Sequence, residues 1–246
     1  MNINYRPEID GLRAIAVISV IFYHANVVIF DEKLFKGGFI GVDIFFVISG
    51  YLITSLILRE LNTTQSFSFM NFYQRRVRRI LPPLFFVMLL CFPVAWVYLD
   101  PGNFIDFSKS ILYSIGFSSN FYFWDMGQQY AAANSLLKPF LHTWSLSIEE
   151  QYYIIFPIFL FIIFRYLRNY LLLFLIVGFI FSLLLADWGS KNYPSATFYF
   201  LHSRAWELIA GSFLAFSEIY QHYKKNNLIT QNSLSFIGFF IILFSI

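Results

Sequence analysis

The sequence predicts an all-α fold, a polytopic bundle of membrane-spanning helices. Of the 246 residues, 58% are hydrophobic and only 13% are charged, whereas soluble domains carry about 25% charged residues. Several apolar runs are long enough to cross a hydrocarbon layer about 30 Å thick. The net charge of +3 is small and resides in particular loops, so it informs membrane topology rather than nucleic-acid binding. The single cysteine, Cys91, excludes an intramolecular disulfide and a cysteine-rich metal site.

The first apolar run covers residues 12–30 and contains two ionisable side chains, Arg13 and His24. They are eleven positions apart, so on a helix they point within about 20° of the same direction, roughly 16 Å apart along the axis. Ionisable groups inside a span usually face a protein interior or a wet cavity. The pair therefore predicts a polar shaft, which Asp10 extends. Alternatively, Arg13 reaches the lipid headgroups and His24 bonds a neighbouring helix.

The second run, residues 39–58, carries one charge, Asp43. This carboxylate is either a functional group inside the membrane or a cap at the interface where the helix starts. Residues 59–79 then carry five arginines and one acidic residue. That bias predicts a cytoplasmic location for this segment and for the N-terminus.

The arginine-rich segment contains two overlapping pairs, Arg75 with Arg78 and Arg76 with Arg79. On a helix, each pair places both guanidinium groups on one side. Such a fork suits the phosphate groups of a ligand. Arginines close to a membrane also act as topological signals or bind anionic lipid, so both interpretations stay open.

The rest of the chain predicts further spans, separated by polar segments. Charge parity requires residues 104–142 to start and finish outside, as an interfacial or re-entrant segment or as two short helices shielded by protein. A polar loop is expected at 187–195. We expect six full spans and a cut seventh, the later ones at 82–99 (begun by Pro82 and Pro83), 143–164, 170–186, 203–216 and 233–246.

Two polar blocks lie on the later helices. In HTWSLSIEEQYY, one helical stripe carries His142, Ser145 and Glu149, while Glu150 and Gln151 turn onto adjacent faces. These residues either take part in catalysis or belong to an interhelical hydrogen-bond network. In SRAWELIAG, Arg204 and Glu207 are three residues apart and form a pair that neutralises itself. No phosphate loop, zinc-ligand spacing or nucleophile turn occurs, so any chemistry uses helix-borne His, Glu, Ser and Arg.

Five blocks together resemble the membrane-bound acyltransferase-3 family, in its O-antigen acetyltransferase type. They are YRPEIDGLRAIAVISVIFYHA, GGFIGVDIFFVISGYLIT, FYQRRVRRILP, LHTWSLSIEEQYYIIFP and SRAWELIAG, in that order between residues 5 and 216. The resemblance implies that residues 1–246 are one transmembrane domain, truncated from about ten spans. The family's required arginine and histidine fall on Arg13 and His24. Its loop arginine motif falls on Arg76 and Arg79, or on Arg75 and Arg78. Its tryptophan-serine-glutamate block falls on Trp144, Ser145, Ser147, Glu149 and Gln151.

The resemblance also implies the activity. Such an enzyme transfers an acyl group, usually acetyl from cytosolic acetyl-coenzyme A, to a hydroxyl of a surface or lipid-linked glycan such as the O-antigen of lipopolysaccharide, across a bacterial inner membrane. His24 would be the base or a transient acyl carrier, Arg13 would stabilise the thioester oxygen or hold the donor, and Glu149 would orient a histidine or the acceptor hydroxyl. No bound cofactor or metal is expected. A transporter or flippase, or a catalytically silent scaffold, is the alternative. The supporting residues are Asp10, Asp43, His142, Trp144, Ser145, Ser147, Gln151, Arg204 and Glu207.

Overall fold

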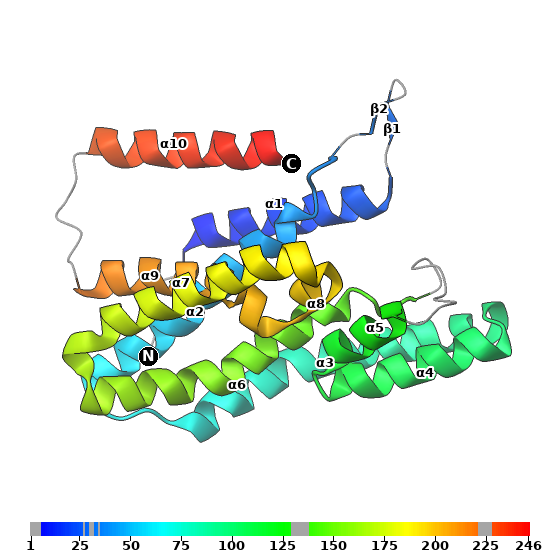
Figure 1. Ribbon diagram of the computed structural model, residues 1–246, viewed down its shortest axis with the longest axis horizontal. Helices are drawn as coiled ribbons and strands as arrows, with labels where there is room; N and C mark the ends of the chain where they lie inside the picture. The colour runs from blue at the N-terminus through cyan, green and yellow to red at the C-terminus, as the bar shows by residue number, and fades with distance from the viewer. Residues whose placement is uncertain (1–5, 27, 30–31, 34, 129–137, 221–227) are drawn as a thin grey trace. The chain divides into compact units, whose positions relative to one another are not determined.

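Helices account for most of the computed structural model (Figure 1), which describes residues 6–26, 28–29, 32–33, 35–128, 138–220 and 228–246. Two short strands, β1 and β2, pair antiparallel. In chain order the elements are α1 (Pro7–His24), β1 (Val28–Ile29), β2 (Glu32–Lys33), α2 (Ile40–Thr64), α3 (Phe69–Tyr98), α4 (Pro101–Ile115), α5 (Ser119–Gln128), α6 (Thr143–Tyr166), η2 (Arg168–Tyr170), α7 (Leu171–Asn192), α8 (Pro194–Tyr199), α9 (Leu201–Tyr220) and α10 (Leu228–Ser245).

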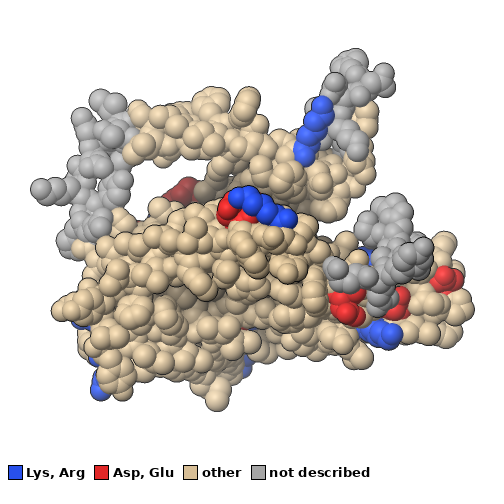
Figure 2. All heavy atoms as spheres, viewed as in Figure 1, with Lys and Arg blue, Asp and Glu red and all other residues tan. Residues whose placement is uncertain are grey.

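Each predicted span contains a helix, and the all-α membrane bundle is confirmed. Within the described residues, four helices are long and apolar enough to cross a membrane: Ile40–Thr64, Phe69–Tyr98, Thr143–Tyr166 and Arg168–Asn192. The protein is thus a multi-pass membrane protein. Figure 2 agrees, because charged side chains are sparse on the face that it shows.

Three predicted boundaries are wrong. The first helix ends at His24 rather than at residue 30, because Asn26 turns the chain at φ 48° ahead of β1. The third helix begins at Phe69, behind the capping Ser68, and continues through Pro82 and Pro83. A proline inside a helix costs about 3 kcal/mol, but neighbouring groups in a membrane protein can satisfy the freed carbonyls. The arginines at 75–79 therefore lie on a helix and not in a loop.

The third correction concerns the polar segment predicted as a loop at 187–195. Helix α7 continues through it to Asn192, and Lys191 Nζ pairs with Asp187 Oδ2 at 2.8 Å across one helical turn. For residues 104–142, the two-helix alternative holds in the described part, as α4 and α5. Helix α4 starts where the Asp100 side chain accepts from the Asn103 N–H at 2.9 Å.

The chain divides into two compact units. Unit 1 comprises residues 1–63, 172–179 and 206–246, and unit 2 comprises 64–171 and 180–205. In unit 1, α2 and α9 approach so closely that a Cβ added at Gly50 would lie 1.8 Å from the Leu208 carbonyl oxygen, and one at Gly211 would lie 1.9 Å from the Val47 oxygen. Thr54 Oγ1 donates to Ser212 Oγ at 2.8 Å in the same contact. Small residues hold these two helices together, as in membrane helix pairs generally.

Candidate active site

Two of the predicted catalytic residues lie on α1 in unit 1. Arg13 Nη1 pairs with Asp10 Oδ1 at 3.3 Å, so the predicted polar stripe includes an ion pair. The buried positions of α1 are Ala16 and Ser19, while the Arg13 side chain is 27% exposed. The contact with Asp10 uses only Nη1, so the other N–H groups of the Arg13 guanidinium can still donate to a ligand.

His24 is the last residue of α1, and its side chain is exposed. Its Nδ1 lies 2.9 Å from the carbonyl oxygen of Val20, one turn earlier. A carbonyl oxygen only accepts, so Nδ1 carries the hydrogen and Nε2 carries the lone pair. The structure gives Nε2 no hydrogen-bond partner among the described residues. In the neutral imidazole, this hydrogen bond favours the tautomer whose Nε2 carries the lone pair.

Asp43 lies in the first turn of α2 and is half-buried. A carboxylate there interacts favourably with the positive end of the helix dipole. This position fits the helix-start interpretation of Asp43.

In unit 2, helices α3 and α6 run antiparallel and bring two predicted groups together. Phe69 packs edge-on against Phe161 at 5.6 Å, and Tyr73 donates its hydroxyl hydrogen to the Ile154 carbonyl oxygen at 3.1 Å. One turn later, the Arg76 guanidinium lies over the Tyr153 ring, 4.4 Å from its centroid. The predicted donor-binding segment thus contacts the acidic block of α6.

The four predicted arginines differ in surroundings. Arg76 is half-buried and lies between Tyr153 and Phe72, the latter ring 5.7 Å away. Its three neighbours are exposed on the same helix: Arg75, Arg78 and Arg79. Of the four, Arg76 is the one that α6 holds in place.

Tyr153 connects Arg76 to the predicted Glu149, because its hydroxyl donates to Glu149 Oε1 at 3.2 Å. The next residue, Glu150, is only 7% exposed, and its Oε1 has no hydrogen-bond partner among the described residues. It interacts electrostatically with Arg76. Sequence reasoning did not select Glu150, although a second carboxylate in a membrane helix was itself a signal.

The interhelical hydrogen-bond network anticipated around this block exists, and it is built from hydroxyls. Thr143 Oγ1 lies 2.8 Å from Ser114 Oγ and donates to Ser119 Oγ at 2.9 Å, and Ser119 Oγ lies 2.8 Å from Ser147 Oγ. Gln151 Nε2 donates to the side-chain Oδ1 of Asn120 and to the backbone carbonyl oxygen of Phe117, each at 2.9 Å. The predicted Ser147 and Gln151 therefore join α6 to α5, and Thr143 joins α6 to α4.

The start of α6 contributes the other predicted residues. His142 is exposed and its carbonyl oxygen accepts from Ser145 Oγ at 3.1 Å. Trp144 is buried, and its ring centroid lies 4.4 Å from that of Phe198 with the two planes tilted by 42°. The Arg204 guanidinium lies 5.9 Å from the Trp144 ring centroid. Glu207, one turn further along α9, is 1% exposed.

A further ionic cluster in unit 1 was not predicted. Glu218 accepts from Arg6 Nη1 and from Arg59 Nη2, each at 3.0 Å, and from the hydroxyl of Tyr51. Arg6 also donates to Glu8 at 2.6 Å, which lowers the pKa of the Glu8 carboxyl. These contacts join α1, α2 and α9. Up to 212 positions separate the partners, so no local pattern could have indicated them.

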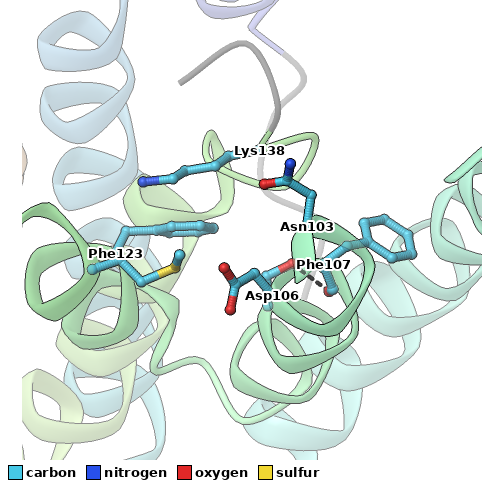
Figure 3. A pocket seen from close by; sticks show the side chains of 7 residues that line it. Asn103, Asp106, Phe107, Phe123 and Lys138 are labelled. Atoms are coloured by element: carbon cyan, nitrogen blue, oxygen red, sulfur yellow. Dashed lines mark hydrogen bonds between the residues drawn. The ribbon is translucent and has the colours of Figure 1, made fainter. Parts of the chain in front are cut away.

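Unit 2 also contains a small pocket, shown in Figure 3. Its cavity of about 10 Å³ has room for about one water molecule, so neither a sugar nor an acyl donor fits it as it stands. It is lined by Asn103, Asp106, Phe107, Ser110, Phe123, Met126 and Lys138.

Comparisons with known proteins find an acyltransferase family and relatives that are named O-acetyltransferases. The model of a family described as an acyltransferase domain matches residues 6–246. The chain is 39% identical over 218 residues to the peptidoglycan O-acetyltransferase OatA of Listeria monocytogenes, an alignment that covers 86% of this chain and 34% of that protein. It is 39% identical over 155 residues to the O-acetyltransferase OatA of Staphylococcus aureus strain NCTC 8325, covering 63% and 24%.

A putative O-acetyltransferase of Staphylococcus aureus strain MSSA476 is 43% identical over 156 residues, again with 63% of this chain covered and 25% of the relative. The chain thus spans about a third or less of the length of these relatives. No solved structure matches the chain.

Proposed function

This chain belongs to the acyltransferase-3 family, and from that premise we propose that it transfers an acetyl group from acetyl-coenzyme A to a hydroxyl of a cell-envelope glycan. The observation that carries the proposal is the contact of His24 Nδ1 with the Val20 carbonyl oxygen, which in the neutral imidazole favours the tautomer whose Nε2 can take a proton. Relatives named O-acetyltransferases support the acetyl group and the oxygen acceptor.

In the proposed reaction, His24 Nε2 takes the proton of the acceptor hydroxyl as its oxygen attacks the thioester carbonyl carbon. The carbon–sulfur bond breaks, and the departing thiolate takes that proton to become free coenzyme A. Transfer through an acetyl group carried briefly on Nε2 uses the same free lone pair and stays open. Arg13 is suited to stabilise the negative charge that develops on the carbonyl oxygen, through N–H groups that its contact with Asp10 does not use.

The donor is anionic, and Arg76 is the residue proposed to hold it. Its guanidinium is positioned by two aromatic rings and has no hydrogen-bond acceptor among the described residues, so its N–H groups are free for phosphate oxygens. The arginine bias of residues 59–79 supports a cytoplasmic location for this end of α3 and for the N-terminus. Cytosolic acetyl-coenzyme A would then reach Arg76 directly. The membrane is proposed to be a bacterial inner membrane.

The acceptor is proposed as a glycan on the opposite side of the membrane. The relatives help to choose between types of glycan, because one of them is named a peptidoglycan O-acetyltransferase. Peptidoglycan is therefore favoured over the O-antigen of lipopolysaccharide that the sequence resemblance suggested. Both acceptors present sugar hydroxyls, so the chemistry proposed for His24 is the same for each.

The test is the release of coenzyme A thiol by the purified full-length protein, with acetyl-coenzyme A and a peptidoglycan fragment. Thiol release that depends on the acceptor, together with acetate ester on the glycan, is expected. A transporter or a silent scaffold would release no thiol above the rate of a heat-inactivated control, and that result would overturn the proposal. O-antigen as a second acceptor tests the choice of glycan separately.

A further inference from the structure

The contact between α3 and α6 places charged side chains within a membrane-spanning helix pair. Tyr153 lies near the middle of α6 (Thr143–Tyr166), one of the four helices long enough to span. Arg76 lies over its ring, and Glu150 is one turn away on α6. A carboxylate such as Glu150 within a membrane-spanning helix is costly, and such groups usually serve a pathway or a ligand.

Glu150 is the most unusual of these groups. It is 7% exposed, and Oε1 has no hydrogen-bond partner among the described residues. Burial of an acceptor without a partner costs free energy, and native structures leave few such groups without a reason. A ligand that donates a hydrogen bond to Oε1 would recover this cost.

A purely structural role does not account for Glu150. The guanidinium of Arg76 is already positioned by the faces of Tyr153 and Phe72, so it does not need the carboxylate for orientation. Glu150 attracts Arg76 electrostatically but forms no ion pair with it at hydrogen-bond distance. The two groups are close in space, opposite in charge, and each lacks a hydrogen-bond partner in the described part of the chain.

We propose that Glu150 and Arg76 together form a binding site for the acyl donor between α3 and α6. Arg76 takes an anionic group of the donor, and Glu150 Oε1 accepts a hydrogen bond from one of its N–H or O–H groups. The inference rests on the proposed function, whose donor carries both: coenzyme A has phosphates, and its pantetheine arm has amide N–H groups. Glu150 is thus a binding residue that the family-derived selection omits.

The experiment measures binding of acetyl-coenzyme A to the purified full-length protein by calorimetry, with thermal unfolding as a parallel measurement. Glu150→Gln keeps the shape of the side chain and replaces the carboxyl group with a neutral amide. Asp187→Asn is the matched control, because it makes the same change at an exposed carboxylate paired with Lys191. The Glu150 variant is expected to bind about tenfold more weakly, with an unfolding midpoint no lower than wild type, while the control is unchanged.

Wild-type affinity in Glu150→Gln would overturn the inference, and so would a weaker affinity that accompanies a lowered unfolding midpoint, since that indicates a structural role. Glu150→Asp keeps the charge and should recover part of the affinity. If the wild-type protein bound no acetyl-coenzyme A, the proposed function would instead be wrong about the acyl donor. The two failures are therefore distinguishable.

Discussion

His24 and Arg76 are each held on one side and free on the other. The imidazole is fixed through Nδ1 to the carbonyl oxygen of Val20, and the guanidinium is fixed by the face of the Tyr153 ring. The remaining atoms, Nε2 and the N–H groups, are those that act on a substrate. Such positioning reduces the entropy lost when a ligand binds or reacts.

At this scale the structure separates arginines that the sequence could not. Arg76→Ala should raise the KM for acetyl-coenzyme A about tenfold or more, because a charged hydrogen bond to phosphate is lost. Arg79→Ala is the matched control, since Arg79 is exposed on the same helix, and it should change KM less than threefold. Equal KM values in both variants and in wild type, at normal membrane levels, would return the cluster to a topological role.

The sequence predicted the types of residue at the site better than their partners. Ser147 and Gln151 were identified, and they do join helices. Glu150 was left out because it lies on a different face of the helix from His142 and Glu149. The spacing of residues along one helix does not show which face another helix covers. The Glu218 cluster depends on pairing between distant segments, which a single sequence does not reveal.

At the scale of the elements, apolar length predicted where the helices lie, because span length follows from membrane thickness. Their ends were less predictable. Pro82 and Pro83 were interpreted as a helix start, yet α3 passes through them. The first helix stops at His24 although apolar residues follow, because Asn26 adopts a left-handed conformation. Local turns and tertiary packing determine where these helices begin and end. The hydropathy of the sequence carries no information about either.

The close contact of α2 with α9 gives a prediction about stability. Gly50→Ala would place a methyl group 1.8 Å from the Leu208 carbonyl oxygen, and such overpacking costs about 1–3 kcal/mol. Thermal unfolding in detergent should show a lower midpoint. Gly11→Ala on α1 is the control, because nothing lies within 4 Å of its added Cβ and alanine favours a helix. A Gly50 variant as stable as the Gly11 variant would show that the two helices do not pack this closely.

At the scale of the whole molecule, the arginine bias predicts which ends of the helices face the cytoplasm. Single cysteines at Thr64, the last residue of α2, and at Glu32, before α2, report the orientation in a background where Cys91 is replaced by serine. In intact cells, a membrane-impermeant thiol reagent should label position 32 and not position 64. The opposite pattern would invert the topology and place Arg76 on the wrong side for a cytosolic donor.

The central claim is that a membrane helix supplies the base for acetyl transfer, and His24→Gln in the full-length protein tests it most directly. Glutamine can hydrogen-bond but cannot take the proton of the acceptor hydroxyl. Because the side chain at position 24 is exposed on α1, misfolding would not explain a loss of acetylation. The measurement is the rate of glycan acetylation in membranes that contain equal amounts of each protein. The rate is expected to be lower than that of the wild type by a factor of about 100. A near-normal rate would contradict it, and the base would then have to be sought near His142 and Glu149.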